Sequence, residues 1–554
     1  MRALADLERC RRRQGAGLAR RKLALLRALA SGKLRSAQQV RRLHEVLCFV
    51  RAYPDDARVL RQVDRMLDRF DRRPDLIAHR EKLAYSGIAG TTLWFPYFYP
   101  TARWIAARWP DLLTLDRTDL VAGRSIAKLL PALLSPLETL ALRESHLAGY
   151  VALDRLRGAR SDATFLVERV IAMPGSEATR EAFYDLINPS CELAAAPGTP
   201  SRTRARFDRA PRAWQSAPLR SERPDLRIEL GRPPRSMRRA SQRDGRELLR
   251  LARETMITRQ RDLDAFAWGN EADVWLADHG GGLAIVLIGM LPERRAALPA
   301  IYGGLTLHNG VPVGYHQSDL LGRSAALSFN TFDTFRGGES AFAFARLLAT
   351  LHHAVDVNSF TIEPFQLGHG NDEGLQSGAW WFYAKLGFMP RDTRVQRLAA
   401  AEAARMRSDA RHRTEPSVLR RLAARHLFFD AEPAAPAPLI SPARIGLQVG
   451  AFLASLAPDD RARALALASR HASAVCGLRT RVALSDSERR AWNALCPLIA
   501  MLAVDDWSIA ERRALLDLVR AKAASSERDY ARMFAAHAPF QAALARLEHP
   551  GSSP

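Results

Sequence analysis

The chain has 554 residues, of which 47% are hydrophobic and 25% are charged. This length exceeds what a single hydrophobic core organises, so we expect about two to four globular domains. The formal net charge is +23 and is carried mainly by arginine. We attribute it to an arginine-favouring composition spread over solvated helices, and rank nucleic-acid binding second, because no segment resembles a known nucleic-acid-binding module.

The sequence predicts neither a membrane span nor a secreted protein. No apolar run approaches the roughly 20 residues needed to cross a bilayer, and the longest, residues 283–291, has the length of a strand. The first residues are charged and lack the apolar core of a secretory signal. The five cysteines are scattered without a CxxC pair, which favours reduced, structural thiols over a zinc site or disulfides. We therefore expect a cytoplasmic, bacterial-type protein with no membrane partner.

Residues 1–190 predict a helical region, because apolar residues recur three and four positions apart. Within it, residues 85–104 are rich in aromatic side chains, and Pro96 and Pro100 preclude a continuous helix. We expect these aromatics to pack one domain against another; the alternative is a ligand pocket or lid. Residues 191–240 are rich in proline and arginine, which indicates a linker or an irregular wrap around a neighbouring domain, with a basic RNA-binding arm as the alternative.

Residues 241–400 predict a mixed α/β domain. A helix is followed by short apolar runs typical of strands, and Asn309 and Gly310 between two such runs are a strong signal for a two-residue hairpin. A strand, a helix, a strand and further helix follow. Residues 401–554 again predict helices, and Ser485 with Glu488 has the spacing of a capping box.

The central residues carry a family resemblance. The hairpin, the strand-turn-helix at 325–348, the strand at 357–365 and the stretch "QSGAWWFYAKLGFMP" (376–390) follow one another in the order found in the Gcn5-related N-acetyltransferase superfamily. Residues 243–392 resemble that superfamily, and these positions match the motif of its last helix, with Gln replacing the usual Asn: Gln376, Ala379, Tyr383, Lys385, Leu386, Gly387 and Phe388. The resemblance implies an acyl-CoA N-acyltransferase-like fold with helical flanks and acetyl-CoA or another acyl-CoA as co-substrate.

The turn before the helix at 340 is the expected phosphate loop. A glycine turn at a helix start exposes backbone N–H groups beside the positive end of the helix dipole, which suits a diphosphate. Two registers of the family's loop motif are possible, and each departs from it at one position: one runs from Arg336 to Ala341 with Glu339 replacing the central glycine, and the other is centred on Gly338 and ends at Ser340, with Phe335 replacing the usual Gln or Arg. The expected coenzyme-binding residues are Phe335, Arg336, Gly337, Gly338, Glu339, Ser340 and Ala341.

Glu339 would oppose a phosphate if its carboxylate faced the loop. Two unit charges about 5 Å apart repel by about 1 kcal/mol in water and about 3 kcal/mol at an effective dielectric near 20. If the carboxylate instead faces solvent in the first helical turn, it stabilises the helix dipole. The register centred on Gly338 places Glu339 at a variable position and favours the second outcome.

Direct acyl transfer to an amine requires an acid for the departing thiolate and a base for the amine. The resemblance makes Tyr383 the candidate acid; packing in the core is the alternative. The base candidates are Asp333, Glu363, His308 and His316. We favour Glu363, since a carboxylate in an otherwise apolar stretch would be hard to ionise if buried. Packing against an arginine is its alternative.

Two further patterns are not expected to be sites. His352 and Asp356 are one helical turn apart, but a solvated helix face explains this spacing better than a metal does. Residues 369–374 offer oxygen ligands without the spacing of a calcium loop, so no metal site is predicted.

The sequence therefore predicts an N-acyltransferase acting on a small-molecule or peptide amine. The alternatives are a non-catalytic scaffold or ligand-binding module of the same fold, and a basic RNA- or ribosome-associated factor. The acceptor, the acyl chain length and the oligomeric state are not predicted.

Overall fold

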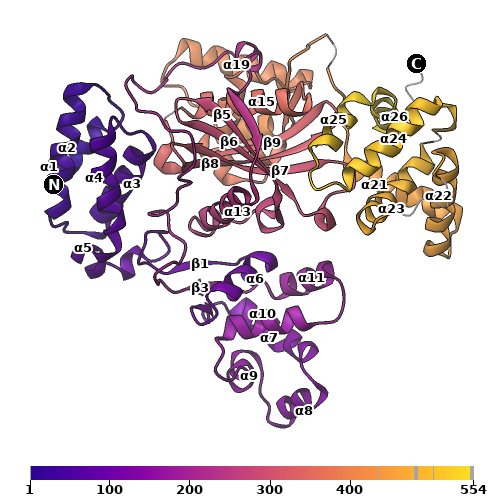
Figure 1. The fold of residues 1–554 in the computed structure, drawn as a ribbon, viewed down its shortest axis with the longest axis horizontal. Coiled ribbons are helices and arrows are strands. Elements are labelled where there is room, and N and C mark those ends of the chain that lie inside the picture. The colour runs from indigo at the N-terminus through magenta and orange to yellow at the C-terminus, as the bar shows by residue number, and fades with distance from the viewer. Residues whose placement is uncertain (1, 338, 435, 479–483, 503, 549–554) are drawn as a thin grey trace.

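A computed structural model of the protein describes residues 2–337, 339–434, 436–478, 484–502 and 504–548. A large mixed sheet forms the centre, with helical regions at either end and a separate lobe beside it (Figure 1). The expected mixed α/β domain between helical regions is confirmed at this level. Among the described residues, none of the helices combines the length and the apolar character needed to cross a membrane.

The N-terminal bundle packs against one end of the sheet. Its core includes Phe49 and Leu47 and extends to Val313 and Phe335 of the central domain. Ser36 and Asp56 accept backbone N–H groups at two helix starts, which explains where those helices begin. The helices are α1 (Arg2–Cys10), α2 (Ala16–Ser31), α3 (Ala37–Ala52), α4 (Ala57–Asp68) and α5 (Pro74–Ala78), followed by the 3-10 turn η2 (Glu81–Leu83).

The lobe combines short helices with a three-stranded sheet of order β1-β3-β2. Tyr97 and Tyr99 from the aromatic stretch are buried in its core, which also takes in Trp268 from the central domain. These aromatics therefore pack the lobe and join it to the sheet, as expected. The elements are β1 (Leu93–Phe95), α6 (Tyr99–Arg108), β2 (Leu113–Leu115), α7 (Leu120–Leu129), α8 (Pro136–Glu144), α9 (Gly149–Leu156), α10 (Asp162–Ala172), α11 (Glu177–Ile187) and β3 (Cys191–Leu193).

Residues 194–225 contain no helix or strand and wrap around the central domain. Phe207 is fully buried in a core that it shares with the helix Gln242–Ile257. Arg51 of α3 donates hydrogen bonds to the carbonyl oxygens of Thr203 and Ala205 at 2.7 and 3.3 Å. The segment is held by these contacts, as a wrap rather than a free linker. Helix α12 (Leu226–Leu230) and the edge strand β4 (Ser236–Arg239) follow, so the sheet begins before residue 241.

The central sheet has eight strands in the order β11-β10-β9-β8-β7-β6-β5-β4. The predicted hairpin is confirmed, with Asn309 and Gly310 at φ of 51° and 80° joining β7 to β8. Only residues that tolerate positive φ allow so tight a connection. The strands are β5 (Gly269–Gly280), β6 (Leu283–Met290), β7 (Ala300–His308), β8 (Val311–Leu321), β9 (Ser324–Thr331), β10 (Ser359–Ile362) and β11 (Leu427–Asp430).

The two faces of the sheet are covered differently. Helix α15 (Ser340–Val355) packs its apolar side on one face, where Phe344 and Leu348 are fully buried. On the other face, α13 (Gln242–Ile257) packs on β5, and α14 (Asp264–Ala267) packs on β5, β6 and β7. Beyond β7 this face carries half-buried polar side chains, among them Gln317 and Asp319 of β8 and Asn330 of β9. We call this part, formed by β8, β9 and β10, the open face.

Helices after β10 complete the central domain. They are α16 (Pro364–Leu367), α17 (Asp372–Ser377), α18 (Ala379–Ala384), α19 (Thr393–Ser408) and α20 (Pro416–Ala423). The helix expected over 379–386 ends at Ala384, and Gly387 follows with φ of 98°. Phe388 does not begin a strand as expected; Met389 forms a single bridge to Phe428, because the edge of β10 is taken by β11. The boundary expected at residue 400 falls inside α19.

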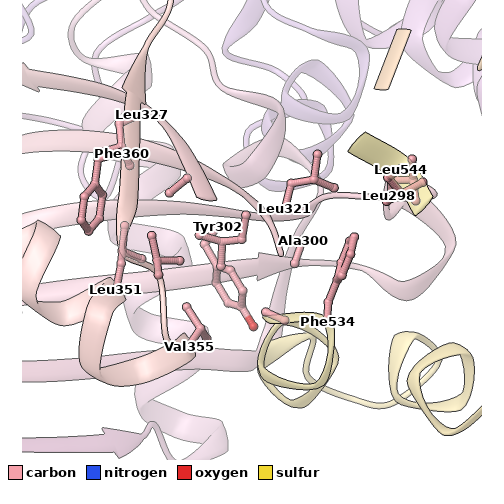
Figure 2. Packing of buried hydrophobic residues seen from close by; sticks show 14 of the residues in the cluster. Leu298, Ala300, Tyr302, Leu321, Leu327, Leu351, Val355, Phe360, Phe534 and Leu544 are labelled. Carbon is pink, nitrogen blue, oxygen red and sulfur yellow. The ribbon is translucent and has the colours of Figure 1, made fainter. Parts of the chain in front are cut away.

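The C-terminal helices dock against the far end of the sheet. Phe534 points toward Ala300 and Tyr302 of the sheet (Figure 2), and the three residues belong to one hydrophobic core that the sheet and the C-terminal helices share. The fully buried Asp273 of β5 accepts hydrogen bonds from Ser526 Oγ at 2.6 Å and from Tyr302 Oη at 3.0 Å. The helices are α21 (Pro442–Leu456), α22 (Arg461–Val475), α23 (Asp486–Met501), α24 (Ile509–Lys522), α25 (Arg528–Ala536) and α26 (Ala538–Glu548).

Candidate functional site

Strands β9 and β10 run parallel and are paired along only part of β9. Three register pairs join them, the last between Ala326 and Thr361, whereas β9 continues to Thr331. Strand β10 ends at Ile362 because Pro364, which has no backbone N–H, begins the next helix. Their connection, α15, starts at the carboxyl end of β9. The last residues of β9, 327–331, therefore have no paired residue of β10 beside them, and we call the space along them the gap.

Tyr383 of α18 fills the gap on the α15 side. Its hydroxyl oxygen accepts the backbone N–H of Phe329, and its ring lies 5.3 Å from that of Phe344 and 5.8 Å from that of Phe388. Only 3% of Tyr383 is exposed, and burial raises the pKa of Tyr383 well above its ordinary value. The phenol keeps its proton at neutral pH.

An acidic pocket lies on the open face where the pairing of β9 with β10 ends. Asp319 of β8, Glu363 after β10 and His426 before β11 line it, together with Ala326 and Thr361 of the last register pair. Residues 437–440 and 442 form another wall, and the pocket holds about 650 Å³ of empty space including its mouth. Its enclosed space is about 110 Å³, which is smaller than the roughly 300 Å³ of a typical small-molecule site. We call it the acid pocket.

Asp319 is the titratable group of this pocket that suits proton transfer. Burial and the charge of Glu363 together raise the pKa of Asp319 to about 6, against a hydrogen bond from Gln317 Nε2 at 2.9 Å. Burial also lowers the pKa of His426. A carboxylate that titrates near neutral pH can accept a proton from a substrate and release it again.

Glu363 lines the acid pocket, but its side chain is exposed and not buried as the base prediction required. It precedes Pro364 at the start of α16, where the chain turns outward from β10. The desolvated carboxylate is its neighbour Asp319, which the sequence analysis did not single out. The alternation of polar side chains along β8 was the available signal, because it places Tyr315, Gln317 and Asp319 on one face.

Asp333 lies apart from the acid pocket. Its side chain is 82% exposed and pairs with Arg336 at 2.8 Å, in the 3-10 turn η5 (Asp333–Phe335) that follows β9. Tyr383 is buried on the opposite face from Glu363 and does not line the acid pocket. The structure therefore does not bring together the three predicted catalytic residues.

The two histidine candidates are buried elsewhere. His308 Nδ1 lies 2.6 Å from the Ala52 carbonyl oxygen, and burial lowers the pKa of His308 to about 4. His316 packs beside Gly304, whose missing side chain leaves room for the ring, and burial lowers the pKa of His316 to about 3. Neither lines the acid pocket.

The expected phosphate loop joins η5 to α15. Phe335 is buried against Phe49 of the N-terminal bundle, so its side chain is structural. Gly337 has φ of 74° and its position lies against the guanidinium of Arg12, which donates to the carbonyl oxygen of Arg336. Gly338, the expected central glycine of one register, lies outside the described residues.

Helix α15 begins at Ser340 without a side-chain cap. The first N–H groups of a helix have no partner within it, and the positive end of the dipole lies beside them. Ser340 and Ala341, both expected to contact a phosphate, occupy this first turn. The turn offers backbone donors that suit an anion.

Glu339 is turned inward. Its Oε1 accepts the Arg220 backbone N–H at 3.2 Å and lies 3.8 Å from Arg220 Nε, while Oε2 lies 3.8 Å from His308 Nε2. Its side chain is 14% exposed and lines a small internal cavity with Tyr53 and Thr306. The carboxylate thus has its own donors beneath the start of α15.

The patterns set aside in the sequence have structural roles. His352 Nδ1 and His353 Nε2 each lie 2.8 Å from a backbone carbonyl oxygen, of Val357 and Leu230. Asn371 caps α17 through its side chain. Within the described ranges, no group of three or more His, Cys, Asp or Glu side chains is placed to hold a metal ion.

Comparisons with protein-family models, with curated proteins and with solved structures found no match for this chain.

Proposed function

We propose that the protein is an acyl-CoA-dependent N-acyltransferase whose base is Asp319. The observation that carries the proposal is the position of the acid pocket: the last residues that pair β9 with β10, Ala326 and Thr361, are also part of its lining. A group transferred through the gap between the strands would arrive beside the carboxylate that can accept a proton.

The start of α15 is the proposed position of the coenzyme's diphosphate. Unpaired backbone N–H groups and the helix dipole favour an anion there. Arg12 adds a guanidinium group beside Gly337. The inward position of Glu339, with Arg220 as its counter-ion, removes most of the repulsion that its carboxylate would otherwise exert.

The proton transfers are assigned to two residues. Asp319 accepts the proton that the amine loses as its nitrogen forms the new bond to the acyl carbon. Tyr383, once its buried hydroxyl turns toward the thioester, donates its proton to the sulfur as the carbon–sulfur bond breaks. The Phe329 N–H, which the hydroxyl then leaves, is the proposed donor to the carbonyl oxygen.

Calorimetry with acetyl-CoA and with longer acyl-CoAs tests the first half of this proposal. We expect measurable heat and a rise in melting temperature for at least one of them. If no acyl-CoA gives either signal, the proposal fails.

A panel of amines then tests the base. Asp319→Asn should lower kcat by two orders of magnitude or more while leaving the affinity for acyl-CoA unchanged, since general-base catalysis contributes about 10²–10⁴-fold. Asp185→Asn is the matched control, because burial also raises the pKa of Asp185, which lies in the lobe. Equal losses in the two variants would contradict the assignment.

One observation favours a second function, a scaffold or a module for another ligand, which neither binds acyl-CoA nor catalyses acyl transfer. Tyr383 occupies the gap between β9 and β10 and satisfies the Phe329 N–H itself. In that case Tyr383→Ala should create acyl-CoA binding that the natural chain lacks. Binding by the natural chain would exclude this alternative.

A further inference from the structure

A wide cleft rich in positive charge opens at the end of β9, between the N-terminal bundle and the end of α13. Seven cationic and three carboxylate side chains line it, an excess of four positive charges. They are Arg11, Arg41, Lys82, Arg202, Arg259, Arg261 and Arg336, with Glu45, Asp333 and Glu373. We call it the basic cleft.

The three carboxylates are already paired. Arg202 binds Glu45 at 2.7 Å and Arg261 binds Glu373 at 2.6 Å, and Asp333 is held by Arg336 as described above. These pairs fix the walls of the cleft and neutralise three of its seven cations.

The other four cations have no carboxylate partner. In the part of the chain that the structure describes, no ion pair includes Arg11, Arg41, Lys82 or Arg259. They come from the N-terminal bundle, the turn after it and the end of α13, so separate segments bring like charges to one concave surface. Such convergence raises the free energy of the empty site and favours an anionic ligand.

Arg259 is the most constrained of them. Its guanidinium lies 3.8 Å from the centroid of the Phe332 ring, and Nη1 donates to the Thr255 carbonyl oxygen at 3.0 Å. Its buried Nε has no hydrogen-bond partner among the described residues. Burial and the charge of Arg202 together lower the pKa of Arg259 to about 9. A guanidinium that is held in place, desolvated and without an anion is costly unless a ligand supplies the missing charge.

Two backbone conformations at the cleft are strained. Tyr85 and Gln260 have φ of 64° and 54°, in the left-handed region that side chains other than glycine, Asn and Asp rarely adopt. Both line the basic cleft. Strain of this kind persists where the surrounding structure fixes it, and it concentrates at ligand sites.

The basic cleft and the acid pocket lie on the same face of the sheet. Asn330 of β9 lines the cleft and Ala326 lines the pocket, with Ser328 between them on the open face. Four residues of strand span roughly 13 Å. The start of α15, proposed for the coenzyme, belongs to the helix that covers the opposite face, and Arg336 of the loop before it lines the basic cleft.

We propose that the basic cleft binds a small polyanion that carries two or more phosphate groups, and that this polyanion is the phosphorylated end of the acyl acceptor. The binding of the polyanion stands on the cleft alone, whereas its role as acceptor rests on the proposed function. The acceptor would then carry its amine roughly 13 Å from its phosphates. A small ligand fits better than nucleic acid, because the three carboxylates in the cleft would repel a continuous phosphate backbone.

Calorimetry on the full chain with inorganic tripolyphosphate tests the cleft. We expect binding that weakens steeply with salt, and at least a tenfold loss in the double variant Arg41→Gln, Lys82→Gln. Both side chains are exposed, so the variant keeps the core intact. The variant Arg407→Gln should bind as the natural chain does, because Arg407 is an exposed arginine of α19 that forms no ion pair with another described residue.

Three results would overturn the cleft proposal: no heat with tripolyphosphate, equal affinity in the double variant, or tighter binding of a single-stranded RNA that tripolyphosphate does not displace. A competition experiment separates the two proposals. Acetyl-CoA should bind in the presence of saturating tripolyphosphate. Displacement of acetyl-CoA would assign the cleft to the coenzyme and overturn the acceptor role. Tripolyphosphate binding without any acetyl-CoA binding would support the polyanion site in the basic cleft and contradict the proposed function.

Discussion

Asp319→Asn should make the protein more stable at alkaline pH. The pKa of Asp319 is raised from 3.8 to about 6 by burial and by the charge of Glu363. A shift of about two units corresponds to at most about 3 kcal/mol of free energy that the folded chain loses when this carboxyl ionises. Below about pH 4 the carboxyl is protonated in both the folded and the unfolded chain, and this contribution to stability is fully present. It is lost as the pH rises through about 6.

The asparagine variant keeps the side-chain shape and an oxygen that accepts from Gln317, but it has no charge to desolvate. Its free energy of unfolding should therefore match that of the natural chain near pH 4 and exceed it near pH 8, by up to about 3 kcal/mol. Urea denaturation of both chains at each pH measures the difference. Such a gain on removing a group is expected where function requires a destabilised side chain.

Asp154→Asn is the control of opposite sign. Hydrogen bonds from Arg117 lower the pKa of Asp154 to about 2, so the ionised form is the favoured one. This substitution should destabilise the protein at neutral pH. If Asp319→Asn is neutral or destabilising near pH 8 while the control behaves as stated, Asp319 is not desolvated, and its assignment as the base is refuted.

Three more outcomes are expected. Glu363→Gln should move the pH midpoint of kcat/KM downward, because its charge raises the pKa of the neighbouring aspartate; an unchanged midpoint would show that the two carboxylates are uncoupled. Tyr383→Phe should accelerate hydrogen exchange of the Phe329 amide, which loses its acceptor, and should lower kcat without changing acyl-CoA affinity; slow exchange in the variant would contradict the hydrogen bond. Acidification from about pH 6.5 to 4 should destabilise the chain by a few kcal/mol, because burial lowers the pKa of His308 and His316 and the unfolded chain binds protons first; urea midpoints that do not fall over this range would argue against neutral, buried imidazoles.

Local rules explain the parts of the fold that the sequence predicts well. Asn309 and Gly310 connect β7 to β8 because the turn requires positive φ at both positions. Ser485 and Glu488 form the expected capping box, each side chain accepting the other's backbone N–H. The five cysteines are buried and unpaired, as their scatter indicates. Each of these predictions depends on residues close together in the chain or on simple counting.

The acid pocket depends instead on segments that are distant in sequence. Asp319 is desolvated by a wall from residues 437–442 and by His426, more than a hundred positions later. The edge strand β4 lies in the segment whose composition predicts an irregular chain. Its four residues pair with β5 through the backbone and carry arginines on an exposed edge, so their side chains show no strand pattern. Neither the burial of Asp319 nor the strand β4 has a signature in the local sequence. The alternation of polar side chains along β8 is such a signature, and it was the available sign of an open face.

The direction of the Glu339 side chain connects the arginine-rich wrap with the proposed coenzyme site at the start of α15. A carboxylate facing the start of α15 would oppose a phosphate there by about 3 kcal/mol, a loss of roughly a hundredfold in affinity. The wrap that precedes β4 prevents this, because it presents the Arg220 backbone N–H and guanidinium to Glu339 from the other side. The arginine-rich segment is thus part of the coenzyme site that we propose, through the one contact that turns a repelling charge away. Removing only the guanidinium, as in Arg220→Ala, should weaken acyl-CoA binding only modestly, since the backbone N–H keeps Glu339 in place; a loss as large as a hundredfold would mean that the guanidinium, and not the backbone, holds the carboxylate.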